Sequence, residues 1–328
     1  MATTLFSKLG YKLLTLFVAL VYSFTPYVAP STAEPIEGNK DNGANATVVA
    51  WADPQFANYM PKRFQPFDAS CEDLANANDG IDGILVAGDI AENGLPNEYE
   101  YILNKLSVAN VGAYMFAVGN HDARLKIYSN TVKNITTLNN KLNADNGNKD
   151  FVIDSLSYTY DINGYTFIIL GTDRTEFEES YFSAERLNWL DSELAKATAQ
   201  GKPAFVVVHQ SLKDTHGLPD TWNSPSETAG TIGKQSDEIK AILNKYKNVF
   251  MISGHLHTGL GQYTYEKIDN FHSINLPSIT IVNKDGNYNN AGTGFMIEIY
   301  NNHVLFRARD FAQGKYIPDY DIDIALAK

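Results

Sequence analysis

The hydrophobic pattern of this chain is built on short apolar runs that end abruptly in polar residues. Five such runs occur, each four or five residues long and almost free of polar side chains. Runs of this length and composition are typical of strands that are buried on both faces of a sheet. The five runs cover residues 48–51, 83–87, 114–118, 205–208 and 249–252.

Aspartate, asparagine, glutamine or histidine follows each run, either directly or within one or two small residues. Glycine lets the backbone turn sharply where a buried strand ends. In α/β sheets, ligands bind just beyond the carboxyl ends of the strands. We therefore expect the five strand ends to bring one set of polar side chains together. The motifs, in order, are Asp53-Pro54-Gln55, Gly88-Asp89, Gly119-Asn120-His121-Asp122, His209-Gln210 and Gly254-His255-Leu256-His257.

Between the runs, apolar residues at helical spacing predict helices that cover the sheet. We expect one helix from about Ala69 to Asn78, one that starts at Pro96, a long one through Leu125 to Leu142, and one capped by Ser183. Residues 157–173 predict a β-hairpin with an Asn-Gly turn. Strand, polar motif and helix form the repeating unit of an α/β layer fold.

Residues 211–233 form the longest stretch without periodicity, so we expect a rim or lid over the site there. Beyond residue 257 the pattern becomes that of β-structure. We expect these later strands to complete a second sheet that faces the first. The predicted strands are 262–267, 278–282, 295–300 and 303–308.

The N-terminus has the parts of a secretory signal peptide. Lys8 and Lys12 precede an apolar run over residues 13–24, and the small residues 31–33 follow. The run is shorter than the roughly 20 residues that a membrane span needs. We expect cleavage after Ala33 and hence a secreted or periplasmic protein; the alternative is an uncleaved membrane anchor.

The chain has a formal net charge of -12, and loss of residues 1–33, with two lysines and no acid, makes it -14. An acidic surface argues against a nucleic-acid backbone or an anionic membrane as the main partner. Cys71 is the only cysteine, so no intramolecular disulfide is possible. Residues 34–46 are polar and rich in turn formers, which predicts a flexible leader before one domain over residues 47–328.

Read in order, the five motifs resemble the calcineurin-like metallophosphoesterase superfamily, and the resemblance covers residues 47 to 310. It implies an α/β fold of four layers, an α-β-β-α sandwich with two facing mixed sheets flanked by helices. It also implies a hydrolase that uses two metal ions and a metal-bridging hydroxide to cleave a phosphate ester on a small molecule or an exposed group. The ions expected are manganese or iron, with zinc or magnesium as alternatives.

The resemblance assigns Asp89 as the ligand that bridges the two ions. Asp53, Gln55 and His257 would hold one ion, through donor types that suit hard or borderline cations. The departure from the family is Gln55, where histidine is most common. An amide oxygen is a harder and weaker ligand than imidazole, so this ion should bind less tightly. Gln55 as a bystander remains the alternative.

The second ion would be held by Asn120, His209 and His255, again by resemblance. His121 would protonate the leaving oxygen as general acid. Glu92 stands where the family usually has an aspartate that orients this histidine, and the alternative for Glu92 is an exposed loop charge.

Arg124 and His216 are candidate substrate-binding residues, since Arg124 follows a motif and His216 lies in the expected lid. For Arg124 the alternative is a solvated charge at a helix start. The serine-hydrolase elbow, the Walker phosphate loop and the dinucleotide-binding glycine motif are all absent from the sequence. The rival function is a catalytically weakened secreted protein on the same fold that captures metal or ligand. Neither the natural substrate nor the oligomeric state follows from these residues.

Overall fold

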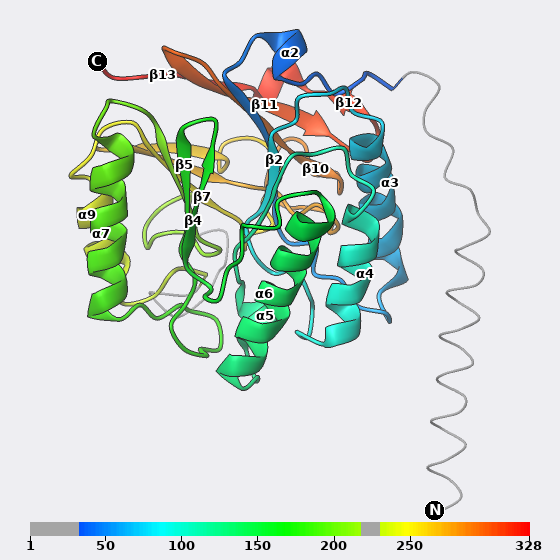
Figure 1. Ribbon diagram of the computed structural model, residues 1–328, viewed down its shortest axis with the longest axis horizontal. Coiled ribbons are helices and arrows are strands. Elements are labelled where there is room, and N and C mark those ends of the chain that lie inside the picture. The colour runs from blue at the N-terminus through cyan, green and yellow to red at the C-terminus, as the bar shows by residue number, and fades with distance from the viewer. Residues whose placement is uncertain (1–32, 218–229) are drawn as a thin grey trace, which may run out of the picture.

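The computed structural model describes residues 33–217 and 230–328, and two β-sheets face each other at its centre (Figure 1). The strands of the first sheet are β1 (Ala46–Trp51), β2 (Gly83–Val86), β3 (Tyr114–Phe116), β10 (Thr293–Ile299), β11 (His303–Asp310), β12 (Lys315–Tyr316) and β13 (Ile322–Ala325). The strands of the second sheet are β4 (Tyr158–Ile162), β5 (Tyr165–Ile169), β6 (Ala204–Val207), β7 (Val249–Ser253), β8 (Tyr265–Ile268) and β9 (Phe271–Asn275).

Helices cover the outer face of each sheet. The helical segments are α2 (Asn39–Asn42), η1 (Pro61–Arg63), α3 (Phe64–Ala75), α4 (Pro96–Leu106), α5 (Asn120–Ala123), α6 (Tyr128–Asp145), α7 (Ala184–Thr198), α9 (Ser236–Leu243) and η2 (Pro318–Tyr320). One apolar cluster joins α3, α4 and α6 to the first sheet, and another joins α7 and α9 to the second (Figure 1). A third cluster, with Phe205, Phe250 and Phe295, fills the space between the sheets. The expected four-layer α-β-β-α sandwich is thereby confirmed.

The five apolar runs belong to two sheets rather than one. The strands β1, β2 and β3 run parallel in the first sheet, whereas β6 and β7 run parallel in the second. The later strands divide as well, since β10 pairs antiparallel with β1 while β9 pairs with β7. The expectation that the later strands complete the second sheet is therefore met by β8 and β9 and is wrong for β10 and β11, which belong to the first sheet. All of β10 is buried, which suits a central strand between β1 and β11.

Two helix predictions need correction. The first helix begins at Phe64 rather than near Ala69. It accommodates Pro66 in its first turn, where a missing N–H breaks no helical hydrogen bond. The long helix does not pass through Leu125, which has a φ of +59° and is 82% exposed. A helix start at Pro96 and the Ser183 cap are confirmed, since the Ser183 hydroxyl accepts a hydrogen bond from the N–H of Arg186.

The predicted hairpin is confirmed as β4 and β5, with Asn163 and Gly164 both at positive φ in the turn. By contrast, residues 278–282 form no strand. Ser278 makes a single bridge to Ala52 and its hydroxyl donates to the carbonyl of Asp53, so this segment supports a motif loop instead.

Residues of the segment 34–46 contact the rest of the domain. Ile36 is 1% exposed within the first sheet's outer cluster. The Glu34 N–H donates to Gly314 O, and Arg309 Nη2 donates to Glu34 O at 2.6 Å. The predicted signal peptide lies outside the described residues apart from Ala33, as does most of the predicted lid. Among the described helices, none is both long and apolar enough to cross a membrane.

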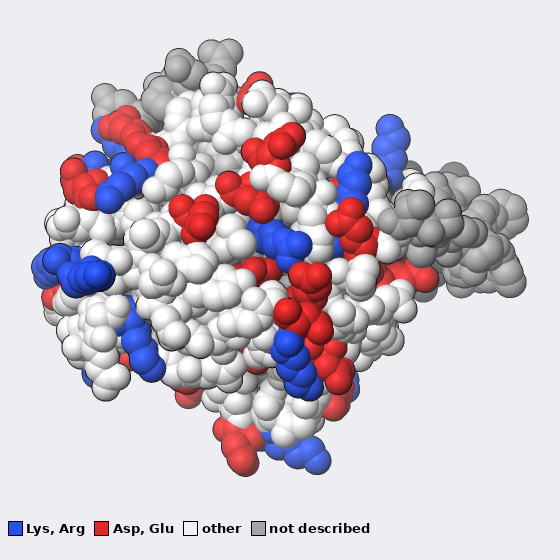
Figure 2. Space-filling view, turned by 90° about the horizontal axis from the view of Figure 1, so that it is seen from above, with Lys and Arg blue, Asp and Glu red and all other residues white. Residues whose placement is uncertain are grey.

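Figure 2 shows one face of the molecule, where acidic and basic side chains are interspersed over a largely uncharged surface. On this face the lysines and arginines stand among carboxylates and do not gather into a broad basic patch. This distribution agrees with the net charge of -12.

Candidate metal centre

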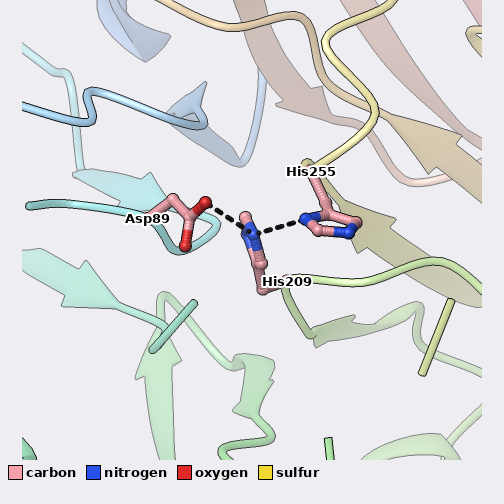
Figure 3. A group of neighbouring side chains, drawn as sticks. All are labelled: Asp89, His209 and His255. Carbon is pink, nitrogen blue, oxygen red and sulfur yellow. Dashed lines mark hydrogen bonds and ion pairs between the residues drawn. The ribbon is translucent and has the colours of Figure 1, made fainter. Parts of the chain in front are cut away.

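The five strand ends meet at one place between the two sheets. Asp89 follows β2, whereas His209 and His255 follow β6 and β7 of the other sheet. One ligand atom from each of these three residues lies within 4.8 Å of the others. Figure 3 shows the His209 ring between the Asp89 carboxylate and the His255 ring. His209 Nε2 is 3.2 Å from Asp89 Oδ2 and 3.2 Å from His255 Nδ1.

The backbone turns that deliver the motif residues are unusual. Non-glycine residues with positive φ are uncommon, and each costs roughly 1–2 kcal/mol. Such residues cluster where a fold holds a functional site against local strain. Five motif residues adopt this conformation: Asp53, Gln55, Asp89, His255 and His257.

Two motif glycines allow the loops to approach one another closely. A Cβ atom at Gly119 would lie 2.1 Å from Asp89 Oδ1, and one at Gly254 would lie 2.5 Å from Asp53 Oδ2. Real Cβ atoms essentially never come so close, so only glycine fits at either position. The glycines of the Gly-Asn-His and Gly-His-x-His motifs therefore make room for the carboxylates of neighbouring motifs.

The Asp89 carboxylate lies between the motif residues of both predicted ions. Its Oδ1 accepts the His121 N–H at 2.8 Å, and its Oδ2 accepts Gln55 Nε2 at 3.0 Å. Burial by itself raises the pKa of Asp89, but His209, His121 and His255 outweigh it and lower that pKa overall. The carboxylate is therefore anionic in its buried position.

We call Asn120, His209 and His255 the inner set, and each of them is at most 3% exposed. His209 Nδ1 donates to Ala87 O at 2.8 Å, which fixes the ring so that Nε2 faces Asn120 Oδ1 at 3.1 Å. Burial lowers the pKa of His209, yet Asp89 and Asp53 raise it to about 9. Burial and the neighbouring His209 hold the pKa of His255 well below its usual value.

These contacts test whether the inner set suits a cation. Acceptor atoms of Asp89, Asn120 and His255 converge at 3.1–3.2 Å on one N–H of a positively charged His209. A proton thus stands where these donors would otherwise meet a metal ion. Carboxylate oxygen, amide oxygen and imidazole nitrogen are common ligands of divalent cations. The residues fit such an ion.

We call Asp53, Gln55 and His257 the outer set. His257 Nε2 lies 3.1 Å from Asp53 Oδ1, and the His255 N–H donates to Asp53 Oδ2 at 2.9 Å. The Gln55 side chain lies in the site, but it presents Nε2 to Asp89. Rotation of this amide by 180° exchanges the positions of its nitrogen and oxygen.

His121 lies beside these sets, with its Nε2 3.9 Å from Asp89 Oδ2. Its Nδ1 lies 3.0 Å from the Glu92 carbonyl oxygen and 3.2 Å from Glu92 Oε1. Burial lowers the pKa of His121, but Glu92 and Asp89 outweigh it and raise that pKa. The Glu92 side chain is only 12% exposed and also pairs with Arg63 at 2.5 Å, so it is not an exposed loop charge.

Arg124 lies with this group, whereas His216 does not. Arg124 Nη2 lies 2.8 Å from His121 Nδ1. His216 is 3% exposed and bonds through its two ring nitrogens to Tyr263 O and Ser273 Oγ. Burial lowers the pKa of His216 to about 4, so it is neutral. The structure therefore does not bring His216 to the cavity, because its side chain packs in the interior and is not among the described residues of the cavity wall.

A cavity of about 480 Å³ opens beside both sets. This volume lies within the range of roughly 300–1,000 Å³ that is usual for small-molecule sites. Its wall combines motif residues with side chains of both charges. The lining residues are Gln55, Asp89, His121, Arg124, Glu178, His255, Leu256, His257, Ile281, Val282, Lys284 and Asp285.

Two residues of the site were not predicted from the sequence. Asp122 accepts hydrogen bonds from the N–H groups of Gly119 and Ala91 and thereby ties two motif loops together. Its position at the third residue of α5 after a capping glycine is a signal that could have revealed it. Glu178 accepts from Asn120 Nδ2 at 2.8 Å, and no sequence signal leads to it.

Solved structures confirm the architecture. A dimetal phosphatase from Danio rerio has a TM-score of 0.56 at 12% identity, and the match covers 87% of this chain and all of that one. Purple acid phosphatase from yellow lupin seeds has a TM-score of 0.55 at 14% identity, covering 85% of this chain and 53% of the other. The Plasmodium protein GAP50, described as the anchor in the inner membrane complex, has a TM-score of 0.54 at 13% identity, covering 86% and 89%.

Sequence comparison agrees with the structures. A 3',5'-cyclic-nucleotide phosphodiesterase of Nostoc sp. is 24% identical over 215 residues, covering 65% of this chain and 68% of the relative. The family model described as calcineurin-like phosphoesterase matches residues 47–259, a span that contains all five motifs. Since this match extends over more than half of the sequence, the chain belongs to the calcineurin-like phosphoesterase family.

Proposed function

We propose that this chain is a secreted phosphoesterase that uses two metal ions, with Asp89 shared between them and His121 as general acid. The observation that carries the proposal is the convergence of Asp89, Asn120 and His255 on one N–H of His209, next to a cavity that also contains His121. Manganese or iron would suit this mixture of oxygen and nitrogen donors, with zinc or magnesium as alternatives.

The inner and outer sets would each hold one ion. Bound divalent ions supply Lewis acidity toward the phosphate ester and lower the pKa of water to near neutrality. The chain contributes the fixed donors around them. Asp89 is buried and anionic between both sets, and the carbonyl of Ala87 keeps His209 Nε2 directed at the inner position. Hydrogen bonds of this kind orient metal ligands and tune their basicity.

His121 is placed to act on the leaving group. Glu92 engages Nδ1, so Nε2 is the nitrogen that can carry a proton into the cavity. The raised pKa of His121 favours the protonated ring, which is the form that a general acid requires. In the proposed step, a hydroxide oxygen bonds to phosphorus while the P–O bond to the leaving group breaks, and the leaving oxygen takes the proton from the Nε2–H bond of His121.

Arg124 lines the same cavity, 2.8 Å from the His121 ring. An arginine is a strong donor to phosphate oxygens. We assign it the role of holding a non-bridging oxygen of the substrate on the side where the leaving group departs. This role is a refinement of the proposed function and concerns substrate binding rather than the bond-making step.

Secretion rests on the N-terminal pattern of basic, apolar and small residues up to Ala33. Expression of the full chain in a secretion-competent host tests it. Amino-terminal sequencing of protein from the medium or periplasm should begin at Glu34, whereas a protein retained with its first residues intact would contradict secretion.

The competing function is capture of metal or ligand without turnover. One observation favours it, namely that Gln55 presents its amide nitrogen rather than its oxygen to the site. The similarity in fold to GAP50, described as an anchor, provides a precedent for a different use of this architecture. Retention of His121 with Glu92 at its Nδ1 favours the enzyme, because metal capture needs no general acid.

Metal content and turnover should be measured on the same preparation. The chain without residues 1–33 is stripped of metal, reloaded with Mn²⁺ and assayed on p-nitrophenyl phosphate and its bis ester. We expect two ions per chain and metal-dependent hydrolysis. His255→Ala should abolish turnover, while His303→Ala, on the half-buried start of β11, is the matched control. Tight metal binding without hydrolysis of either ester would favour the competing function.

A further inference from the structure

Glu178 lies in the loop between β5 and α7 and contacts two residues of the site. Its Oε2 accepts from Asn120 Nδ2 at 2.8 Å, and its Oε1 accepts from Arg124 Nη1 at 3.1 Å. The loop is fastened to the end of β6, since Gln210 Nε2 donates to Glu178 O at 2.8 Å. The Ser180 hydroxyl donates in turn to Gln210 Oε1 at 2.7 Å. The carboxylate is thus held on the cavity wall.

An amide side chain has two different ends, and this contact determines how Asn120 is oriented. An ionised carboxylate only accepts hydrogen bonds, so it must face the NH₂ end of the amide. The oxygen end of Asn120 is then directed away from Glu178, to 3.1 Å from His209 Nε2. Oxygen is the end of an amide that binds a cation.

We propose that Glu178 is a positioning residue that holds Asn120 as an oxygen donor at the inner metal position. The inference rests on the metal centre proposed above. Its second contact extends the same role to the substrate side, because the carboxylate also fixes the Arg124 guanidinium beside His121. The Glu178 side chain therefore aligns Asn120 as a metal ligand and Arg124 as a hydrogen-bond donor to a phosphate oxygen.

Gln55 shows what an amide in this site looks like without such a partner. Within residues 33–217 and 230–328, its NH₂ group donates to the Asp89 carboxylate itself. Its oxygen must exchange places with its nitrogen before it can bind a cation. Asn120 needs no such rearrangement, and preorganised groups bind at a lower cost. The effect of Glu178 should therefore be confined to the inner position.

Direct metal titration tests this inference without an activity assay. Metal-free wild type, Glu178→Ala, Glu178→Gln and Glu176→Ala are titrated with Mn²⁺, and free Mn²⁺ is counted by electron paramagnetic resonance. Loss of a residue that orients a ligand typically weakens metal affinity by about 10–100-fold. We expect a loss of this size for the tighter ion in Glu178→Ala. Glu178→Gln should lose less, because its amide oxygen still accepts from Asn120.

Glu176→Ala removes another carboxylate of the same loop, one that pairs with Arg174 at 2.6 Å, so it should bind Mn²⁺ like the wild type. Affinities within twofold of wild type in Glu178→Ala would overturn the inference, as would equal losses in Glu178→Ala and Glu176→Ala. A wild type that binds two ions but hydrolyses no ester would overturn the proposed function alone. The Mn²⁺ titration would still decide whether Glu178 is a positioning residue.

Discussion

The inner and outer sets share Asp89 yet differ in how firmly the fold holds them. The inner set is buried, and contacts from outside the site orient two of its members: Ala87 O holds His209, and Glu178 holds Asn120. In the outer set, the His257 side chain is 26% exposed and the Gln55 amide turns its nitrogen inward. The proposed centre should therefore hold its inner ion more tightly than its outer one.

Replacement of the shared residue should have the largest effect. Asp89→Asn removes the one anion that serves both sets, so we expect neither set to retain its ion at micromolar Mn²⁺. The value of kcat/KM should fall at least about 1,000-fold, or about 4 kcal/mol. Metal analysis and circular dichroism on the same sample check this. Activity within tenfold of wild type would show that the two sets work independently.

Replacement of one histidine in each set tests the comparison between the inner and the outer set. His255→Ala should weaken the tighter ion by more than the roughly 100-fold expected for a residue that only orients a ligand. His257→Ala should spare the tighter ion and weaken the second one. Calorimetric titration with Mn²⁺ separates the two binding steps. If His257→Ala abolishes the tighter step, the assignment of inner and outer sets must be reversed.

Glu92→Gln should alter the pH dependence rather than the metal content. Glu92 raises the pKa of His121, so its neutral analogue lets His121 lose its proton at lower pH. Since the general acid must be protonated, the alkaline limb of kcat/KM should move to lower pH. We expect about a tenfold loss at pH 8, greater for an alkyl than for a p-nitrophenyl leaving group. An unchanged alkaline limb would remove His121 from the role of general acid.

The smallest effect, and the only gain, is expected at Gln55. Gln55→His supplies an imidazole in place of the inward-facing amide nitrogen, so affinity for the outer ion should rise about tenfold, or about 1.4 kcal/mol. Gln55→Ala is the matched control and should change that affinity by less than threefold. Equal affinities in all three proteins would identify Gln55 as a bystander.

The sequence was informative where local pattern and chemistry coincide. Apolar runs followed by Asp, Asn or His predicted the strand ends, and the Asn-Gly pair predicted the β4–β5 turn. It was uninformative about which sheet each strand joins. A run such as 249–252 is buried on both faces in either sheet, so its composition does not distinguish between neighbours.

Long-range side-chain partners were also beyond prediction. Glu178 is 58 residues from Asn120 and belongs to no motif, so only the folded chain reveals their contact. His216 illustrates the same limit. A histidine in an irregular segment suggested substrate contact, whereas packing against Tyr263 and Ser273 places it in the interior.

The meeting of two sheets at one site also has a mechanical consequence. Asp53 and His257 touch although 204 residues separate them, and they extend from different sheets. An ion held by both would close a loop of that length, a cross-link of the kind that disulfides provide in many exported proteins. With Cys71 alone, this chain cannot form such a bond. A bound metal ion would then stabilise the fold as well as take part in the reaction. Its removal should weaken the contact between the two sheets.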